Sequence, residues 1–182
     1  VDTGYYSAAG VDTRNICGTY STSGSLDTAA YTTSTTVSTT EGDCKCTAGY
    51  YDDGTTNVGT QATCVAVGTG YFSADQDTTR TICNTGYSTT TTSSSTCNAC
   101  AAGYGGSSTA SGAGTVGSDG CSACIAGKYQ TSIAATTTCL TCGSDTAAAS
   151  VPAGYTTAGT ASTASTHCLC SAGYSGDATI NN

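Results

Sequence analysis

The sequence predicts a small, disulfide-rich fold that is mostly β-strand and loop: an elongated tandem-repeat rod of short hairpins with little or no helix. Three observations predict it. Leu, Ile, Val and Phe are scarce, far below the share of roughly 20% that a chain needs to fold by hydrophobic burial alone. Thirteen cysteines are present, and Gly-Tyr pairs recur beside them. Cross-links must therefore supply the stability that a wide aliphatic core normally provides.

Composition also limits where the protein works and what it binds. Cysteines at this density indicate an oxidising compartment, so we expect a secreted or cell-surface protein. Four basic residues stand against 12 acidic ones, for a net charge of −8. This balance argues against nucleic-acid binding, which requires cations to neutralise phosphates. No apolar run is long enough to span a bilayer, so we expect no direct membrane insertion in this segment.

Internal repeats organise the chain. The aligned blocks Thr3–Cys17 and Thr69–Cys83 share nine identities, and a weaker copy runs from Gly127 to Cys139. The chain therefore divides into three cysteine-rich repeats, at residues 1–64, 65–121 and 122–182. Repeats of this size are too small to bury separate cores, so we expect them to stack in a line.

Secondary structure follows the same spacing along each repeat. Thr and Tyr favour strands, Gly interrupts the chain at short intervals, and no stretch shows a sustained 3.6-residue apolar period. These features predict short strands and hairpins. The one expected exception is a helical turn at residues 145–150, which Pro152 would end.

The cysteine spacing resembles that of known extracellular repeats. The pattern C-x2-C-x2-G-x-Y, spacer, C-x2-C, fitted closely by residues 121–142, is similar to ephrin-receptor-like and growth-factor-receptor cysteine-rich repeats. Together with the Thr, Ala, Ser and Gly bias, the chain resembles the immobilization-type surface antigens of ciliates. That resemblance implies a secreted protist protein carried as a dense cell-surface coat.

The resemblance also implies a disulfide pairing, in which first cysteines bond third ones and second cysteines bond fourth ones. Val67 stands where a cysteine is expected, and the site at Cys83 lacks its second cysteine, so one bridge is missing as a pair. The predicted bridges are Cys17–Cys44, Cys64–Cys83, Cys97–Cys121, Cys100–Cys124, Cys139–Cys168 and Cys142–Cys170. Cys46 is then left unpaired, as a candidate for an intermolecular bond.

A nearest-neighbour scheme remains open, because connectivity does not follow from spacing alone. It pairs Cys17–Cys44, Cys46–Cys64, Cys83–Cys97, Cys100–Cys121, Cys124–Cys139 and Cys142–Cys168. This scheme leaves Cys170 as the unpaired thiol.

Metal sites and catalysis receive little support. Two C-x2-C pairs, beginning at Cys97 and Cys121, have zinc-ribbon spacing, but other cysteines fall outside any group of four. His167 is the only histidine and Glu41 the only glutamate, too few for a catalytic triad. Acidic pairs at residues 52–53 and 75–77 lack the ligand count of a calcium loop. We therefore expect no enzyme, no metal and no cofactor.

The remaining signals concern packing and modification. Tyrosines of the Gly-Tyr positions are expected to lay their rings over disulfides: Tyr50, Tyr71, Tyr87, Tyr104, Tyr129, Tyr155 and Tyr174. Thr and Ser are abundant and clustered, and Thr/Ser tracts in secreted proteins are acceptors for O-linked glycans. The candidate O-glycosylation sites are Thr35, Thr36, Thr89, Thr90, Thr91, Thr92 and Thr163.

Taken together, these features predict an extracellular structural protein, a repeat subunit of a cell-surface coat or fibril. We expect glycosylation, and self-association into a filament or coat through stacking and disulfides. The alternative is a receptor-like ectodomain or spacer that binds a protein ligand. Ice binding is disfavoured, because the Gly-Tyr spacings are too uneven for a flat Thr array.

Overall fold

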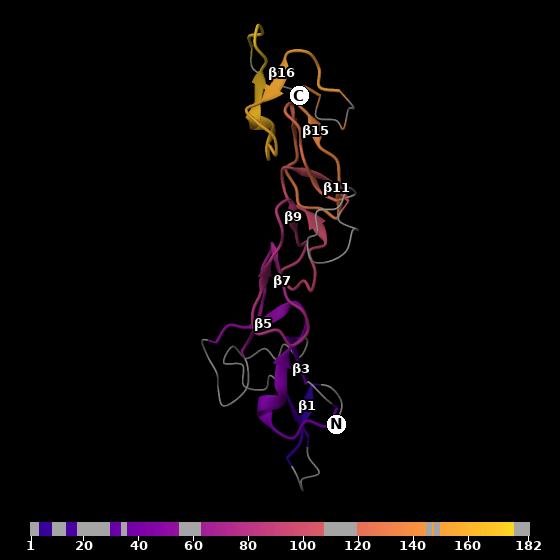
Figure 1. The fold of residues 1–182 in the computed structure, drawn as a ribbon, viewed down its shortest axis with the longest axis vertical. Helices are drawn as coiled ribbons and strands as arrows, with labels where there is room; N and C mark the ends of the chain where they lie inside the picture. The colour runs from indigo at the N-terminus through magenta and orange to yellow at the C-terminus, as the bar shows by residue number, and fades with distance from the viewer. Residues whose placement is uncertain are drawn as a thin grey trace. The chain divides into compact units, whose positions relative to one another are not determined.

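A computed structural model describes residues 4–8, 14–17, 30–33, 36–54, 63–107, 120–144, 147 and 150–176. Within this part of the chain the elements are short antiparallel strands and two 3₁₀ turns, η2 (Glu41–Asp43) and η3 (Ser165–His167) (Figure 1). The predicted disulfide-rich fold of short tandem hairpins with almost no helix is confirmed. The helical turn expected at 145–150 falls largely outside the described residues.

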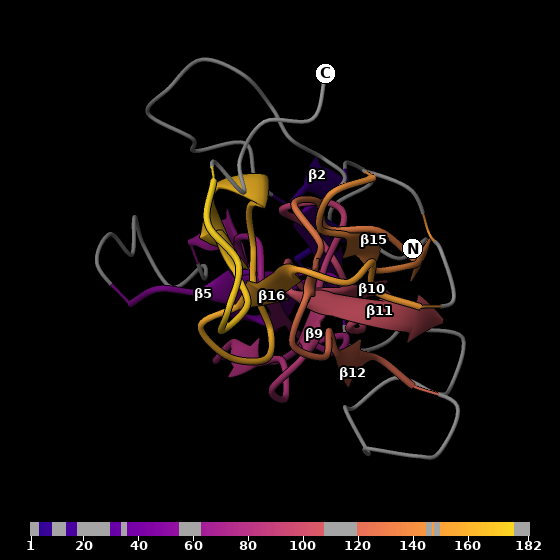
Figure 2. The same cartoon turned by 90° about the horizontal axis from the view of Figure 1, so that it is seen from above.

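The described strands form eight successive hairpins, numbered 1 to 8 in chain order. Their bounds are β1 (Tyr5–Tyr6) with β2 (Asn15–Ile16), β3 (Tyr31–Thr33) with β4 (Cys44–Cys46), β5 (Tyr50–Asp52) with β6 (Cys64–Ala66), β7 (Tyr71–Phe72) with β8 (Thr81–Ile82), β9 (Tyr87–Ser88) with β10 (Ala99–Cys100), β11 (Tyr104–Ser107) with β12 (Ser122–Ala123), β13 (Lys128–Tyr129) with β15 (Leu140–Thr141), and β16 (Tyr155–Thr157) with β17 (Cys168–Cys170). A further strand, β14 (Thr136–Thr137), pairs with β11 and makes the sheet β12-β11-β14. In Figure 2, β11 is the broad arrow at the right.

The chain divides into two compact units. One comprises residues 1–82 with 91–96, and the other comprises residues 83–90 with 97–182. Strands β1 to β8 belong to the first unit and strands β9 to β17 to the second. The division into repeats at 64/65 and 121/122 is one of sequence similarity and stays a prediction.

A glycine begins most hairpins, because the backbone there adopts a conformation that other residues rarely take. Gly4, Gly49 and Gly127 have φ angles of 84°, 88° and 83°. The second strand returns to this glycine: the amide of Cys17 donates to the Gly4 carbonyl at 2.9 Å, and that of Val67 donates to the Gly49 carbonyl at 3.1 Å. The Gly-Tyr signature thus marks the start of the first strand and the closing point of the second.

Buried hydroxyl groups join neighbouring hairpins at the same glycines. The glycine N–H of one hairpin donates to a Thr or Ser hydroxyl on the first strand of the next hairpin or directly after it. These pairs are Gly4 with Thr33 (3.2 Å), Gly49 with Ser73 (3.1 Å) and Gly127 with Thr157 (3.0 Å). The three acceptor residues are at most 5% exposed. Part of the hydroxyl content is therefore structural, since these side chains accept hydrogen bonds from backbone amides at the junctions. The Gly49 amide also donates to the Ser73 carbonyl, at 3.1 Å.

Cystines form most of the core. Most of the buried apolar residues in the described part are cysteines, and the others are Ala, Val or Tyr. In hairpins 7 and 8, Tyr129, Cys142 and Cys168 form one buried cluster, and Leu140 and Tyr155 pack against it. Disulfide-bonded cysteines thus occupy most of the buried positions that aliphatic residues fill in an ordinary core, as expected from the sequence.

Close backbone packing at Gly103 generates a test of this arrangement. A Cβ atom on Gly103 would lie 2.4 Å from the Ala161 carbonyl oxygen, whereas a Cβ on Gly173 would meet nothing within 4 Å. Both glycines have positive φ, 85° and 88°, so each Ala substitution carries the same backbone cost of about 1–2 kcal/mol. We expect Gly103→Ala to lose about 2 kcal/mol more than Gly173→Ala in denaturant unfolding of the oxidised protein. Equal losses would contradict the close approach.

Candidate functional site

The feature that recurs through the structure is a disulfide junction between successive hairpins. We call the residue near the start of a hairpin's second strand its front position and the residue at the end of that strand its rear position. A rear cysteine bonds the front cysteine of the following hairpin in Cys17–Cys44, Cys46–Cys64, Cys100–Cys121, Cys124–Cys139 and Cys142–Cys168. Cys83–Cys97, both in the second unit, has the same order along the chain. Cys170, in the rear position of hairpin 8, carries a free thiol.

The pairing implied by the resemblance is thus mostly wrong. Cys17–Cys44 is present. The other five predicted bridges are not: Cys64–Cys83, Cys97–Cys121, Cys100–Cys124, Cys139–Cys168 and Cys142–Cys170 are each replaced by the nearest-neighbour pairing. Cys46, predicted to be unpaired, is bonded to Cys64. The thiol left over is Cys170, as in the alternative that the sequence left open.

Strand geometry explains why the nearest-neighbour disulfides form and the first-to-third, second-to-fourth pairing does not. In an extended strand, residues three apart point to opposite faces and lie about 10 Å apart. Cys121 and Cys124, at the two ends of β12, therefore reach different neighbours: Cys121 bonds Cys100 and Cys124 bonds Cys139. Pairing first with third and second with fourth would require two neighbouring second strands to lie fully side by side. Here the end of one such strand meets only the start of the next.

One junction of the first unit has no disulfide, and an arginine takes its place. Val67, in the rear position of hairpin 3, is fully buried. The guanidinium Nη1 of Arg80 donates to the Val67 carbonyl at 2.9 Å. Because Tyr71 pairs with Ile82, Arg80 lies in the front position of hairpin 4. The sequence aligned Val67 with a cysteine of another repeat and paired it with a gap after Cys83, whereas the structure pairs this position with Arg80.

Both arginines of the chain occupy front positions and stack on tyrosines. Arg80 lies over the Tyr71 ring at 4.2 Å from its centroid and over the Tyr51 ring at 5.4 Å. Arg14, in the front position of hairpin 1, lies over the Tyr5 ring at 4.6 Å. Each exposed cation–π contact contributes about 0.5–1 kcal/mol. Sequence reasoning missed this role, although the Arg repeated in the Thr3–Cys17 and Thr69–Cys83 blocks was the available signal.

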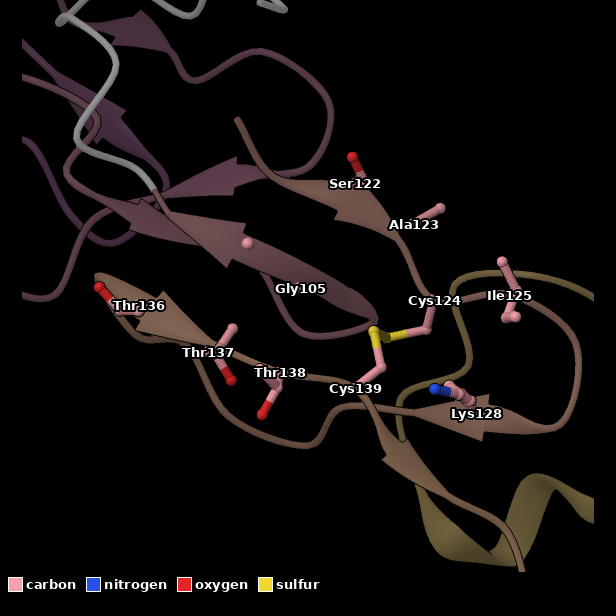
Figure 3. A pocket seen from close by; sticks show the side chains of 11 residues that line it. Gly105, Ser122, Ala123, Cys124, Ile125, Lys128, Thr136, Thr137, Thr138 and Cys139 are labelled. Carbon is pink, nitrogen blue, oxygen red and sulfur yellow. A yellow bond between two sulfur atoms is a disulfide. The ribbon is translucent and has the colours of Figure 1, made fainter. Parts of the chain in front are cut away.

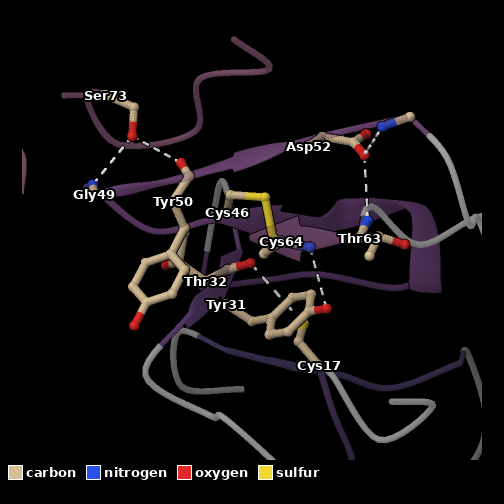
Figure 4. Close-up of a disulfide and its surroundings, with 11 residues drawn as sticks. Cys17, Tyr31, Thr32, Cys46, Gly49, Tyr50, Asp52, Thr63, Cys64 and Ser73 are labelled. Atoms are coloured by element: carbon tan, nitrogen blue, oxygen red, sulfur yellow. Dashed lines mark hydrogen bonds between the residues drawn. A yellow bond between two sulfur atoms is a disulfide. The ribbon is translucent and has the colours of Figure 1, made fainter. Parts of the chain in front are cut away.

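The Gly-Tyr tyrosines pack on the junctions in more than one way. The predicted packing against a disulfide is confirmed for Tyr129 and Tyr155, which lie beside Cys142–Cys168. Elsewhere the tyrosine hydroxyl accepts a hydrogen bond at the junction. Tyr31, which follows Ala30 and begins hairpin 2, accepts one from the Cys64 amide at 3.3 Å (Figure 4). Tyr87 accepts one from the Cys121 amide, also at 3.3 Å.

Other Gly-Tyr rings lie against glycines of the preceding turns. A Cβ on Gly86 would lie 2.8 Å from the Tyr104 ring, and one on Gly154 would lie 2.9 Å from the Tyr174 ring. Gly therefore provides the space that the ring of the following turn occupies. The Tyr71 ring instead stacks against the guanidinium group of Arg80.

The residues considered for metals and catalysis are used in other ways. The cysteines of the zinc-ribbon spacing are all in disulfides, and the described residues contain no group of three or more His, Cys, Asp or Glu that could hold a metal ion. The Asp52 carboxylate accepts hydrogen bonds from the amides of Gly54 (3.1 Å) and Thr63 (3.3 Å). Asp77 accepts one from the Ala74 amide at 2.9 Å. These carboxylates stabilise turns. His167 is exposed at the end of η3.

Asp43 fixes the turn that leads into Cys44. The backbone amides of Thr40 and Thr39 donate to its carboxylate at 3.0 and 2.9 Å, and these bonds hold the Asp43 pKa below its ordinary value of 3.8. The depressed folded pKa means that this contribution to stability is complete above the unfolded pKa. It is lost as the pH falls through the lowered folded value.

The structure separates the O-glycosylation candidates. Thr36, Thr90, Thr91, Thr92 and Thr163 are exposed. Thr89 is 0% exposed, so in the folded chain its hydroxyl is out of reach of a glycosyltransferase. Thr35 lies outside the described residues.

Comparisons with known proteins give no family. No protein-family model and no curated protein matches the sequence. In the described part of the chain, no helix is long and apolar enough to cross a membrane. Six disulfides nonetheless fit an oxidising, extracellular or secreted setting.

The Val67–Arg80 contact generates a prediction about the missing bridge. We expect the double variant Val67→Cys/Arg80→Cys to form a seventh disulfide, because the two positions match the rear and front positions that are bridged elsewhere. Closing this short loop contributes about 3 kcal/mol to the free energy of unfolding. Loss of the Arg80 hydrogen bond and ring stacking costs a similar amount, so we expect the bridge to form with little net gain in stability.

Counting free thiols in denaturant tests whether the seventh disulfide forms. In monomeric protein, the wild type and the double variant should each show one thiol, that of Cys170, and each single variant should show two. Three thiols in the double variant would contradict the assignment of Arg80 to the front position.

Proposed function

We propose that this protein is an extracellular structural protein, a repeat subunit of a cell-surface coat or fibril, and not an enzyme. The observation that supports it is the repeated junction. Within each unit, two kinds of contact recur between one hairpin and the next: a cystine from rear to front position and, at three junctions, a glycine amide bonded to a hydroxyl of the next hairpin. A chain of this kind can be extended by further hairpins without a separate core for each one, because each repeat contacts only its neighbours, as in other repeat proteins.

The elongated rod expected from the sequence belongs to this proposal, as does the likeness to protist surface antigens of the ciliate immobilization type. Their support is the sequence pattern: cysteine period, Gly-Tyr signature and Thr/Ser/Ala/Gly bias. The net charge of −8 favours a partner other than nucleic acid. Secretion or display on the cell surface follows from the cystines, which cytosolic reductants would open.

We place the covalent point of assembly at Cys170 in place of Cys46. Its thiol is half-buried, and its Sγ lies 3.4 Å from the Gly176 carbonyl oxygen. Every other cysteine in a rear position bonds a cysteine farther along the chain. Because the other twelve cysteines are paired within the chain, the partner that a second copy offers is its own Cys170.

Electron microscopy of the purified oxidised protein tests the coat or fibril role. We expect ordered filaments or arrays without any added ligand, held by non-covalent stacking, together with disulfide-linked dimers on non-reducing gels. Cys170→Ser should remove the covalent dimers and keep the six internal disulfides by mass.

Two results would contradict this assignment. Self-assembly would be excluded if the wild type and Cys170→Ser both remained monomeric under oxidising conditions. A one-to-one complex with a protein ligand, in the absence of filaments, would instead support the receptor-like alternative.

Glycan mapping tests the predicted modification. On protein from its natural source, we expect O-linked glycans among Thr36, Thr90, Thr91, Thr92 and Thr163, because these side chains are exposed, and none on the buried Thr89. Fragmentation mass spectrometry that preserves glycans locates them. An intact mass equal to the sequence mass less two hydrogens per disulfide would rule out glycosylation.

A further inference from the structure

We infer that the second unit contains a binding groove for a single-chain amphiphile, a molecule with an apolar tail and one anionic headgroup. The groove lies along the sheet β12-β11-β14 and has a volume of about 560 Å³. Sites for small ligands typically measure about 300–1,000 Å³, with mostly apolar walls and a few polar groups. This groove has that size and that kind of lining.

Glycines on the central strand open the groove. Gly105 and Gly106 of β11 line it and carry no side chains, while their partners across the sheet are Ser122 on β12 and Thr137 on β14. A Cβ on Gly105 would lie 2.9 Å from the Cys139 sulfur, so Cys139 packs directly against the bare backbone of β11. The two glycines add no side chain to the groove between the outer strands.

Apolar groups form the walls. In Figure 3, Ala123 and Ile125 lie on one side and Thr137 on the other, with the Cys124–Cys139 disulfide where the two sides converge. Ile125 is 60% exposed, although large aliphatic residues are scarce in this chain. An exposed isoleucine beside an apolar groove provides surface that an alkyl chain would cover.

Lys128 supplies the charge that selects the ligand. It is the one charged residue among those that line the groove, in a chain with four basic and 12 acidic residues. Figure 3 shows its side chain beside Cys139 at the groove. A half-buried ammonium next to an apolar surface complements an anionic headgroup attached to an apolar tail.

The hairpin repeat shows that Lys128 departs from the local rule. Its amide donates to the Ile125 carbonyl at 3.0 Å, the same three-residue turn that the amide of Tyr50 makes with Thr47 and that of Tyr104 with Ala101. The other described hairpins have Tyr at the start of the first strand. Hairpin 7 alone among them has Lys there, and that position lines the groove.

Titration with octanoate and octanol tests the site, since the two probes share a tail and differ in charge. Amide chemical shifts of the ¹⁵N-labelled, oxidised protein report binding, at probe concentrations below micelle formation. We expect both probes to shift the amides of residues 122–128 and 136–139 in a saturable manner. Octanoate should bind more tightly than octanol, and its affinity should fall as salt rises.

Matched variants separate the tail from the headgroup. Lys128→Gln should weaken octanoate about fivefold and octanol less than about twofold, as expected for a partly exposed ion pair. Lys45→Gln, which removes the chain's other lysine in the first unit, should change neither affinity. Ala123→Phe, which fills the groove from an exposed strand position that tolerates aromatic residues, should weaken both probes at least about tenfold.

Several outcomes would overturn the inference: no saturable binding of octanoate, equal losses in Lys128→Gln and Lys45→Gln, or unchanged binding in Ala123→Phe. Mass spectrometry showing six disulfides in each variant establishes that the variants are folded before binding is compared. Should Ala123→Phe fail this check, Ile125→Ser replaces it, with weaker binding of both probes expected and unchanged binding contradicting the groove.

Discussion

The rear-to-front disulfide between successive hairpins is the interaction on which the rest of the structure depends. The strands in the described part are very short, and an isolated hairpin of that length is marginal in water. A cystine that closes a loop of about 15 residues contributes about 3 kcal/mol. Because the sequence separations of the bonded cysteines run from 14 to 27, each bond constrains roughly one hairpin. The cross-links are therefore spaced at the scale on which the chain otherwise lacks a core.

Hydroxyl-rich composition follows from this architecture. With the core reduced to cystines, the backbone amide of the starting glycine lies at the junction, buried or half-buried, where a hydrogen-bond acceptor stabilises it. Thr33, Ser73 and Thr157 provide it. Thr and Ser therefore have two roles that composition alone does not distinguish: buried acceptors at junctions and exposed residues on loops. Thr89, predicted as a glycan acceptor from its tract, is buried.

Structural features that depend on adjacent residues could be predicted from the sequence, whereas features that depend on how distant segments pack could not. The Gly-Tyr signature predicted where hairpins begin, because a positive φ and a strand-forming aromatic are properties of adjacent residues. The pairing of cysteines depends on register and on which face of a strand each cysteine occupies, and neither is visible in spacing. Cys46 and Cys170 both follow C-x-C spacing, yet Cys46 is bonded and Cys170 is free. The groove was equally hidden, because it arises where β14 joins β11.

The Val67–Arg80 junction shows what the architecture tolerates. A charged hydrogen bond contributes about 1.5–3 kcal/mol and the stacking of Arg80 on Tyr71 about 0.5–1 kcal/mol, together similar to one cystine. A cystine and the Arg80 contacts stabilise a junction by different mechanisms, however. A cystine constrains the unfolded chain, whereas the contacts of an exposed arginine are lost as soon as the junction opens. The junction between hairpins 3 and 4 is therefore the point in the first unit where local opening requires no covalent bond to break. The Arg80–Val67 and Gly49–Ser73 hydrogen bonds and the stacking of Arg80 on Tyr51 and Tyr71 are what oppose it.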